Sequence, residues 1–255
     1  MKYSIDIYKN GSSNGPGPEL FFLNEWGKEF NLYTYVYVIK GNDSTIVLDT
    51  GCGDIEAFNQ MLFEAFGGKI KFNMPEDEKI EGIINKTGLD AEKVDYVILS
   101  HLHFDHSSNV RLFPNAKVVL SKKGLFEFMK KERPYYYDSI LFPTEPVEYV
   151  ASLPSDKVIL IEDEQEIMPG IKVFWVGGHT PGCIATEVDT KKGKVVFSTD
   201  IAPFLSNIER NIPTGLFYDL WECYEAYEKI RDRADIIIPG HDPATLDKHF
   251  REGKI

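Results

Sequence analysis

The chain has 255 residues, with 28 Lys or Arg against 40 Asp or Glu, which gives a net charge of −12 at pH 7. This length supports one large domain, or two closely fused halves, with a sizeable core. The acidic balance and the lack of a long basic block disfavour extended binding to nucleic acid or to an anionic membrane.

The three cysteines, Cys52, Cys183 and Cys223, are widely spaced and form no CxxC pair. A disulfide framework or a thiolate zinc cluster is therefore disfavoured, and a reducing cytoplasm fits best. The N-terminal segment MKYSIDIYKN lacks the apolar core of a signal peptide, and no apolar run is long enough to span a bilayer. We expect a soluble, cytoplasmic protein whose oligomeric state the sequence leaves open, a homodimer included.

The first third of the chain predicts a loop, a hairpin and a helix. Residues 10–18 are rich in Gly, Ser, Asn and Pro and predict a loop near the first strands. Residues 32–39 and 45–48 are β-branched or aromatic and predict a hairpin with its turn at residues 41–43. After Asp49 the apolar period changes to that of a helix, which Gly67 and Gly68 end.

The rest of the chain alternates strands with helices. A second helix is predicted around Ile80, and a third follows a strand in the segment KGLFEFMKK. Strands are predicted at residues 94–99, 116–121, 158–161, 171–176, 194–198 and 235–238, with a helix over 218–230 before the last of them. This alternation predicts a layered α/β domain.

The segment ILSHLHFDHSSN gathers His101, His103, Asp105 and His106 directly after an apolar strand. Imidazoles with one intervening residue, followed by a carboxylate, suit a metal that accepts nitrogen and oxygen donors. Three imidazoles this close contribute little as core packing and cost stability when charged. The stretch therefore predicts a metal site.

Three further polar side chains also come directly after predicted strands. His179 lies in WVGGHTPG, Asp200 ends KVVFSTD, and His241 lies in DIIIPGHD. Only His249 among the six histidines falls outside this scheme. Loops at strand ends commonly carry function, so these residues are candidates for the same site.

Together these motifs resemble the metallo-β-lactamase superfamily: HxHxDH at residues 101–106, followed in the family's order by His179, Asp200 and His241. The segment IVLDTG resembles the first motif of that family, with Asp49 as its aspartate. The resemblance covers the chain from about residue 32 to about residue 243. It implies a four-layer αββα sandwich, a single domain over residues 1–255 built from two related halves, with a two-metal site at one edge.

The resemblance also implies how the ligands divide. One metal would be bound by His101, His103 and His179, the other by Asp105, His106 and His241, with Asp200 bridging both. Zinc is the first expectation for such donors, and iron, manganese or cobalt would suit the same ligands.

Asp49 has two interpretations of equal weight. In one it holds the histidine loop by hydrogen bonds, as residues behind metal ligands do. In the other it is a turn aspartate that satisfies backbone amides before Gly51.

Hydrolysis of a small-molecule substrate is the expected reaction. Two divalent ions can hold a bridging hydroxide that attacks a carbonyl, and Asp105 is placed in the family scheme to accept or relay a proton. The loop VDYVILSHLHFDHSSNVRLFPNAKVVLSKKG and the motif GGHTPG resemble N-acyl homoserine lactone hydrolases, so a lactone is the first expected substrate. A glyoxalase II-like thioesterase, an iron-dependent sulfur dioxygenase and a non-catalytic metal-binding protein are the alternatives.

Two departures from that group stand out. Ser107, Ser108 and Asn109 follow the last histidine of the loop, where the group usually has small residues and glycines. Pro203 stands where the group usually has a tyrosine that bonds the substrate carbonyl. Tyr218, or one of the tyrosines at 135–137, is a candidate to replace it, although aromatic packing or a surface position is the favoured interpretation of these residues.

Two long segments, residues 133–146 and 201–217, are rich in proline and aromatics and predict specificity loops. They supply candidates for an apolar substrate pocket, although burial in the core is expected for at least half of them: Phe204, Leu205, Ile208, Phe217 and Tyr218. Arg210 is expected at the surface, and Cys183 is expected to be a small buried residue rather than a ligand.

Overall fold

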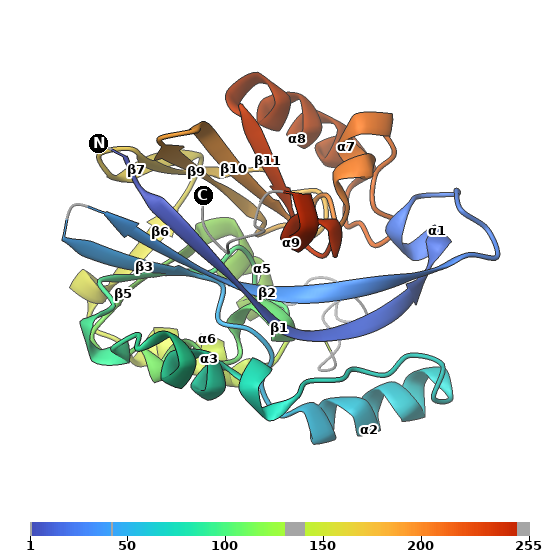
Figure 1. Ribbon diagram of the computed structural model, residues 1–255, viewed down its shortest axis with the longest axis horizontal. Coiled ribbons are helices and arrows are strands. Elements are labelled where there is room, and N and C mark those ends of the chain that lie inside the picture. The colour runs from blue at the N-terminus through green and yellow to red at the C-terminus, as the bar shows by residue number, and fades with distance from the viewer. Residues whose placement is uncertain (1, 42, 131–140, 249–255) are drawn as a thin grey trace.

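A computed structural model describes residues 2–41, 43–130 and 141–248 of the chain. Two sheets lie face to face with helices on the outside (Figure 1). The first sheet has six strands in the order β1-β2-β3-β4-β5-β6: Ser4–Pro16, Glu29–Gly41, Ser44–Leu48, Tyr96–Ile98, Lys117–Ser121 and Val158–Ile161. The second has five in the order β11-β10-β9-β8-β7: Ile236–Pro239, Gly193–Thr199, Ile184–Thr190, Ile171–Trp175 and Glu164–Met168.

The strand directions place several carboxyl ends at one edge. Strands β3, β4, β5 and β6 are mutually parallel, while β1, β2 and β3 are antiparallel. In the second sheet β10 and β11 are parallel and the other pairs are antiparallel. Because the carboxyl ends of parallel strands meet at one edge of a sheet, β3 with β4 and β10 with β11 can deliver side chains to the same place.

Three apolar layers hold the architecture together. Alternate residues of β2, such as Tyr37 and Ile39, pack between the sheets, whereas Val36 and Val38 pack toward the helices. Both faces of this strand are covered, which explains its continuous apolar run. The outer layers cover the first sheet with α3, α5 and α6 (Ile80–Thr87, Lys122–Lys130, Thr144–Ser152) and the second with α7 and α8 (Leu205–Arg210, Leu220–Arg233). The predicted four-layer αββα sandwich is confirmed.

The remaining helices are α1, α2, α4 and α9 (Gly17–Leu20, Ile55–Phe66, Phe104–Ser107, Ala244–Lys248). Helix α2 begins where Asp54 accepts the amides of Glu56 and Ala57 at 3.0 and 3.1 Å, and it ends at Gly67, whose φ is 62°. These are ordinary N- and C-terminal caps. Among the described residues no helix combines the length and apolarity that crossing a membrane requires.

The prediction of a loop at residues 10–18 is wrong over most of its length. Strand β1 continues to Pro16 and pairs with β2 beyond an irregularity between Lys9 and Ser12. Gly11, at φ 95°, allows that irregularity, and β1 is an edge strand, where proline and glycine are tolerated. The polar composition therefore reflects a bulged edge rather than a loop.

Candidate metal centre

Seven polar side chains meet at the strand ends between the two sheets. The chain leaves β4 at Ile98 and turns into α4, β8 is followed by a glycine turn, and β10 and β11 each end one or two residues before a polar side chain. These segments bring together the seven candidate ligands of the sequence: His101, His103, Asp105, His106, His179, Asp200 and His241. All are buried or nearly so.

The first metal group consists of His101, His103, His179 and Asp200. Oδ2 of Asp200 lies 3.6 Å from Nε2 of His179 and 3.9 Å from Nε2 of His101. Nε2 of His179 lies 3.1 Å from Nδ1 of His103. The donor atoms of the group therefore face one point.

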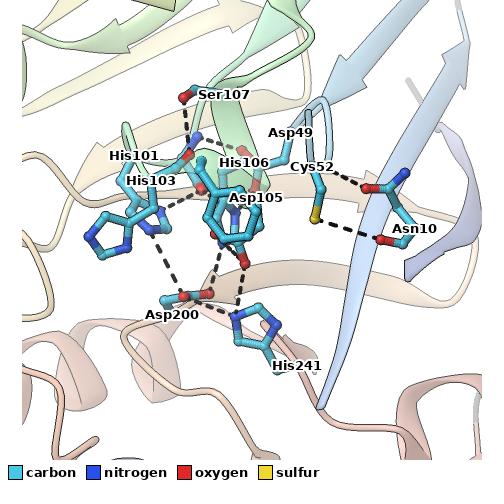
Figure 2. Close-up of polar contacts among 12 residues, drawn as sticks. Asn10, Asp49, Cys52, His101, His103, Asp105, His106, Ser107, Asp200 and His241 are labelled. Carbon is cyan, nitrogen blue, oxygen red and sulfur yellow. Dashed lines mark hydrogen bonds and ion pairs between the residues drawn. The ribbon is translucent and has the colours of Figure 1, made fainter. Parts of the chain in front are cut away.

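The second metal group consists of Asp105, His106, Asp200 and His241. Nε2 of His106 lies 3.3 Å from Oδ1 of Asp200 and 3.5 Å from Oδ2 of Asp105. Nε2 of His241 lies 3.0 Å from Oδ2 of Asp200. Figure 2 shows the carboxylate of Asp200 between the imidazoles of His101, His106 and His241, so it belongs to both groups.

The donor atoms fit divalent metal ions. Ligands at the usual distance from a tetrahedral zinc ion stand about 3.3 Å apart, close to the separations in both groups. Nε2 of His101, Nε2 of His106 and Oδ1 of Asp200 are buried and make no hydrogen bond. Buried polar atoms are normally satisfied, and coordinated ions would satisfy these.

Four of the histidines make a polar contact through Nδ1, the ring nitrogen that faces away from the metal groups. Nδ1 of His106 lies 2.7 Å from Oδ2 of Asp49, and Nδ1 of His241 donates to the carbonyl of Tyr33 at 2.9 Å. Nδ1 of His179 donates to the carbonyl of Leu216, and Nδ1 of His101 lies 3.1 Å from the hydroxyl of Ser100. Bonds on the outer nitrogen fix the ring and leave Nε2 free as a ligand.

The contacts of Asp49 match the first of its two interpretations, in which it holds the histidine loop. Its Oδ1 accepts the backbone amide of Ser100 at 2.8 Å, and its Oδ2 accepts the Ser100 hydroxyl at 2.8 Å. The same Oδ2 contacts His106, so one buried carboxylate fixes both the start of the histidine loop and the ring. Sequence reasoning did not single out Ser100, whose only signal is its place before the first histidine.

Burial and charge separate the two groups electrostatically. In the first group, burial and the neighbouring imidazoles lower the pKa of His101 well below its usual value, and burial lowers the pKa of His103 to about 3. Burial also lowers the pKa of His179. These rings are therefore neutral at pH 7, as metal ligands must be.

In the second group, carboxylates dominate. Burial opposes the charge of His241, but Asp200 and Asp105 outweigh it and raise its pKa to about 9. Burial likewise opposes the charge of His106, but Asp105, Asp200 and Asp49 raise its pKa well above the usual value. For Asp200, burial raises the pKa, but His241 and His106 outweigh it and hold the pKa well below its usual value.

The five candidates for a substrate pocket divide between core and partly buried positions. Phe204 packs with Phe21 in one apolar cluster, and Ile208 is 2% exposed in another, because α7 turns both side chains inward. These two are core residues. Leu205, Phe217 and Tyr218 are partly buried, and the last two directly follow Leu216, whose carbonyl binds His179.

Three other sequence candidates are placed as follows. Tyrosines 135–137 lie outside the described residues. Arg210 pairs with Glu25 at 2.7 Å, so it lies at the surface as expected. Cys183 is fully buried beside Thr180.

A cavity of about 610 Å³ lies beside α4, among the described residues. Its lining includes Phe104, which stands between two candidate ligands in the sequence, together with apolar residues of α2 and its neighbours: Cys52, Ile55, Phe58, Met61 and Met74. Five ionisable residues line the rest of the cavity: Asp54, Glu56, Lys79, Glu81 and Glu145. The rings of Phe58 and Phe104 stack with their centroids 3.4 Å apart. The sequence did not reveal this cavity, because the apolar face of α2 has the pattern of ordinary core packing.

A family model described as the metallo-beta-lactamase superfamily matches residues 31–241. The chain therefore belongs to the metallo-beta-lactamase superfamily, as the motifs at its strand ends predict.

Several relatives are lactonases. An N-acyl homoserine lactonase of Bacillus cereus is 27% identical over 222 residues, which cover 85% of this chain and 84% of the relative. A solved N-acyl homoserine lactone hydrolase, with the product N-hexanoyl-L-homoserine bound at its catalytic metal centre, has a TM-score of 0.81 at 23% identity, covering 97% of this chain and 96% of that one. A dizinc quorum-quenching lactonase has a TM-score of 0.68 at 16% identity, covering 94% and 88%. The two structures share the fold of this chain.

Proposed function

We propose that the chain is a two-metal hydrolase that opens the ring of N-acyl homoserine lactones. The observation that carries this proposal is the pair of metal groups sharing Asp200. Two groups with one common carboxylate suit a pair of ions a few ångströms apart, the arrangement used to hydrolyse esters and phosphoesters. The lactonase relatives direct the choice of substrate toward a cyclic ester.

The histidine and carboxylate donors suit zinc first, although the same ligands accept iron, manganese or cobalt. Divalent ions at such a site lower the pKa of a water molecule and polarise the carbonyl that is attacked.

Asp105 is the candidate for accepting the proton that the attacking water molecule loses. Its Oδ2 lies 3.5 Å from Nε2 of His106 and 3.8 Å from Nε2 of His241, within the same metal group as Asp200. Burial raises its pKa, but His106 outweighs burial and the pKa falls below the usual value, so Asp105 is ionised and able to accept a proton. When the ring C–O bond breaks, this proton passes to the leaving oxygen, which gives a hydroxyl and a carboxylate.

The cavity beside α4 suits the acyl tail. It lies next to the helix that carries Asp105 and His106, and its wall contains the side chains of Phe58, Met61 and Phe104. Burying each methylene of a tail there contributes about 0.8 kcal/mol. We therefore propose that efficiency rises with acyl chain length until the tail fills the cavity.

The donor for the lactone carbonyl must differ from the tyrosine usual in the group. At that position the carbonyl of Pro203 accepts the backbone amide of His241 at 2.8 Å, so this segment fixes His241 and offers no hydroxyl. Polarisation of the carbonyl is therefore assigned to the ions, and Tyr218 is the described side chain that the sequence offers as a second donor.

The test is proton release by zinc-loaded protein on acyl homoserine lactones from butanoyl to dodecanoyl. A simple γ-lactone and a glutathione thioester serve as comparison substrates. Ring opening with kcat/KM that increases along the series is the expected result. Protein that holds two metal equivalents yet turns over only the thioester would replace the lactonase by a thioesterase, and oxygen uptake with a persulfide would point to the dioxygenase.

A further inference from the structure

The side-chain amide of Asn109 contacts three consecutive backbone carbonyls. Its Nδ2 donates toward the carbonyl oxygens of Thr50 at 2.9 Å, Gly51 at 3.2 Å and Cys52 at 2.7 Å. The backbone amide of Asn109 also donates to the hydroxyl of Thr50 at 3.1 Å. A single side chain, just beyond the end of α4, thus holds the loop that follows β3, residues Asp49–Cys52.

That loop needs to be held. Asp49 has a φ of 57°, a left-handed conformation that costs a non-glycine residue free energy, and Gly51 has a φ of 74°. On the far side of the loop, the amide of Cys52 donates to Oδ1 of Asn10 at 2.7 Å, a contact visible in Figure 2. The loop is therefore fixed between Asn10 and Asn109.

The same loop fixes one metal ligand. The amide and hydroxyl of Thr50 both donate to the carbonyl of His106, at 2.7 and 3.0 Å. The carboxylate of Asp49 lies 2.7 Å from Nδ1 of the same histidine. Thr50 therefore positions the backbone of His106, and Asp49 positions its ring. Asn109 binds the carbonyl of Thr50 directly, and Asp49 is the residue before Thr50.

We propose that Asn109 is a positioning residue for the second metal group, acting through the Asp49–Cys52 loop on His106. The proposal rests on the proposed function only in requiring that both metal groups be occupied. It gives a role to one of the three polar residues that follow the last histidine of the loop in this chain.

The first metal group provides an internal reference. His179 is held by the carbonyl of Leu216, which lies in a different part of the chain and outside the Asp49–Cys52 loop. His101 is held by Ser100, which also binds Asp49, so it is linked to the loop less directly than His106. Loss of the Asn109 amide should therefore weaken the second group more than the first.

The test is stepwise titration of metal-free protein with Co²⁺, which follows the visible absorption bands and the affinity of each equivalent by competition with a chelator. Asn109→Asp keeps the shape but replaces the donor with a carboxylate facing three carbonyls, and Asn109→Ala removes it. Both should weaken binding of the ion in the second metal group about tenfold and change its absorption bands, with the ion of the first metal group much less affected. Thr50→Val, which breaks the next link, should reproduce the effect.

Asn115→Asp is the matched control. Asn115 also donates its side-chain amide to a backbone carbonyl, that of Glu92 at 3.0 Å, but lies on the opposite end of the strands. It should leave both equivalents unchanged. Equal weakening of both equivalents in the Asn109 variants, or no weakening with only a lower Tm, overturns the positioning role. A wild-type chain that binds no metal overturns the proposed function instead.

Discussion

Oδ2 of Asp49 lies 2.7 Å from Nδ1 of His106, on the opposite side of the ring from Asp105 and Asp200. The carboxylate accepts the Nδ1 proton, so Nε2 is the atom that faces the centre of the second metal group and binds the ion once it loses its own proton. Asp49 is itself fixed by the amide and hydroxyl of Ser100. This relationship sets the direction of one ligand before any ion arrives.

Asp49→Asn tests this relationship. An amide of the same size accepts the proton less strongly and can present a donor to Nδ1 instead, which favours the wrong tautomer of His106. We expect metal affinity and kcat/KM to fall about 10- to 100-fold. Metal titration and initial rates measure both. Asp90→Asn, which alters a carboxylate that caps a remote 3-10 helix by accepting the amide of Glu92, should change neither. Wild-type affinity in the Asp49 variant would leave Asp49 only its bonds to Ser100 and no influence on the metal ligand.

Asp200→Ala tests the shared ligand. It leaves each metal group with three donors and removes the only carboxylate common to both. We expect loss of at least one metal equivalent and of activity by about 100-fold or more, because the chemistry depends on both ions. Elemental analysis and turnover are measured on the same sample. The exposed Asp163→Ala is the control, and an Asp200 variant with full metal content and full turnover would remove the bridging role.

Removal of the metals should lower stability. An ion present at a thousand times its dissociation constant stabilises the native state by about 4 kcal/mol. For a chain of this size that corresponds to a decrease in Tm of roughly 10 °C on chelation. Differential scanning calorimetry before and after dialysis against a chelator measures it, and reloading should restore the original value. An unchanged Tm after verified metal loss would show that the ions contribute nothing to the fold.

The stability of the metal-free protein should depend on His241. Its pKa of about 9 exceeds that of an unfolded histidine, near 6.5, so its interaction with Asp200 stabilises the fold fully below pH 6.5. That contribution is lost as the pH rises through about 9. Urea unfolding of the metal-free protein at pH 6.5 and 9.5 should reveal the loss, and His241→Asn should diminish it. An equal pH dependence in the variant would assign the effect to other groups.

Metal binding should also release protons. His241 and His106 are charged in the metal-free protein at pH 7, and both must be neutral to bind an ion. We expect release of about two protons per chain and an affinity that increases from pH 6.5 to pH 9. Calorimetry in two buffers of different ionisation enthalpy counts the protons. The same heat in both buffers would contradict this charge state.

Gly177→Ala tests the turn before His179. Gly177 and Gly67 have φ values of 63° and 62°, so alanine carries the same backbone cost of about 1–2 kcal/mol at either position. At Gly177 the added carbon would also lie 2.3 Å from Oε2 of Glu222 and 2.5 Å from the ring of Trp175, whereas nothing lies within 4 Å at Gly67. Gly177→Ala should therefore cost about 1–3 kcal/mol more in urea unfolding and lose metal, which Gly67→Ala should retain. Equal losses of unfolding free energy in the two variants would show that the turn at Gly177 can rearrange to accept the added carbon.

The layers and most strands could be predicted from sequence because their residues are locally consistent. The apolar runs ending at Leu48, Ile98 and Pro239 mark strands, and a polar residue directly after such a run has to lie at the sheet edge. The seven candidate ligands lie in the short segments that follow such runs, within eight residues of a strand end, and the structure places them together. That the two halves of the fold are related to each other stays a prediction.

Other features depend on contacts between distant residues. Strand β1 looks like a loop because its partner, β2, supplies the bonds that its own composition does not suggest. Residues 205–210 form α7 inside a predicted long connection because Ile208 finds an apolar layer beneath it. The role of Asn109 depends on carbonyls more than fifty residues earlier, and no local pattern reveals such a contact.

Each metal group draws ligands from both sheets. His101 and His106 come from the first sheet, while His179 and His241 come from the second, and Asp200 joins the two groups. Occupied sites would therefore act as two cross-links between layers that otherwise adhere through a large apolar interface and a few hydrogen bonds, such as that from the amide of Tyr3 to the carbonyl of Asp189. The sheets could not slide or separate without releasing the ions. Loss of metal and separation of the two sheets are therefore coupled. A substitution in the apolar layer between the sheets should lower metal affinity before any other property changes.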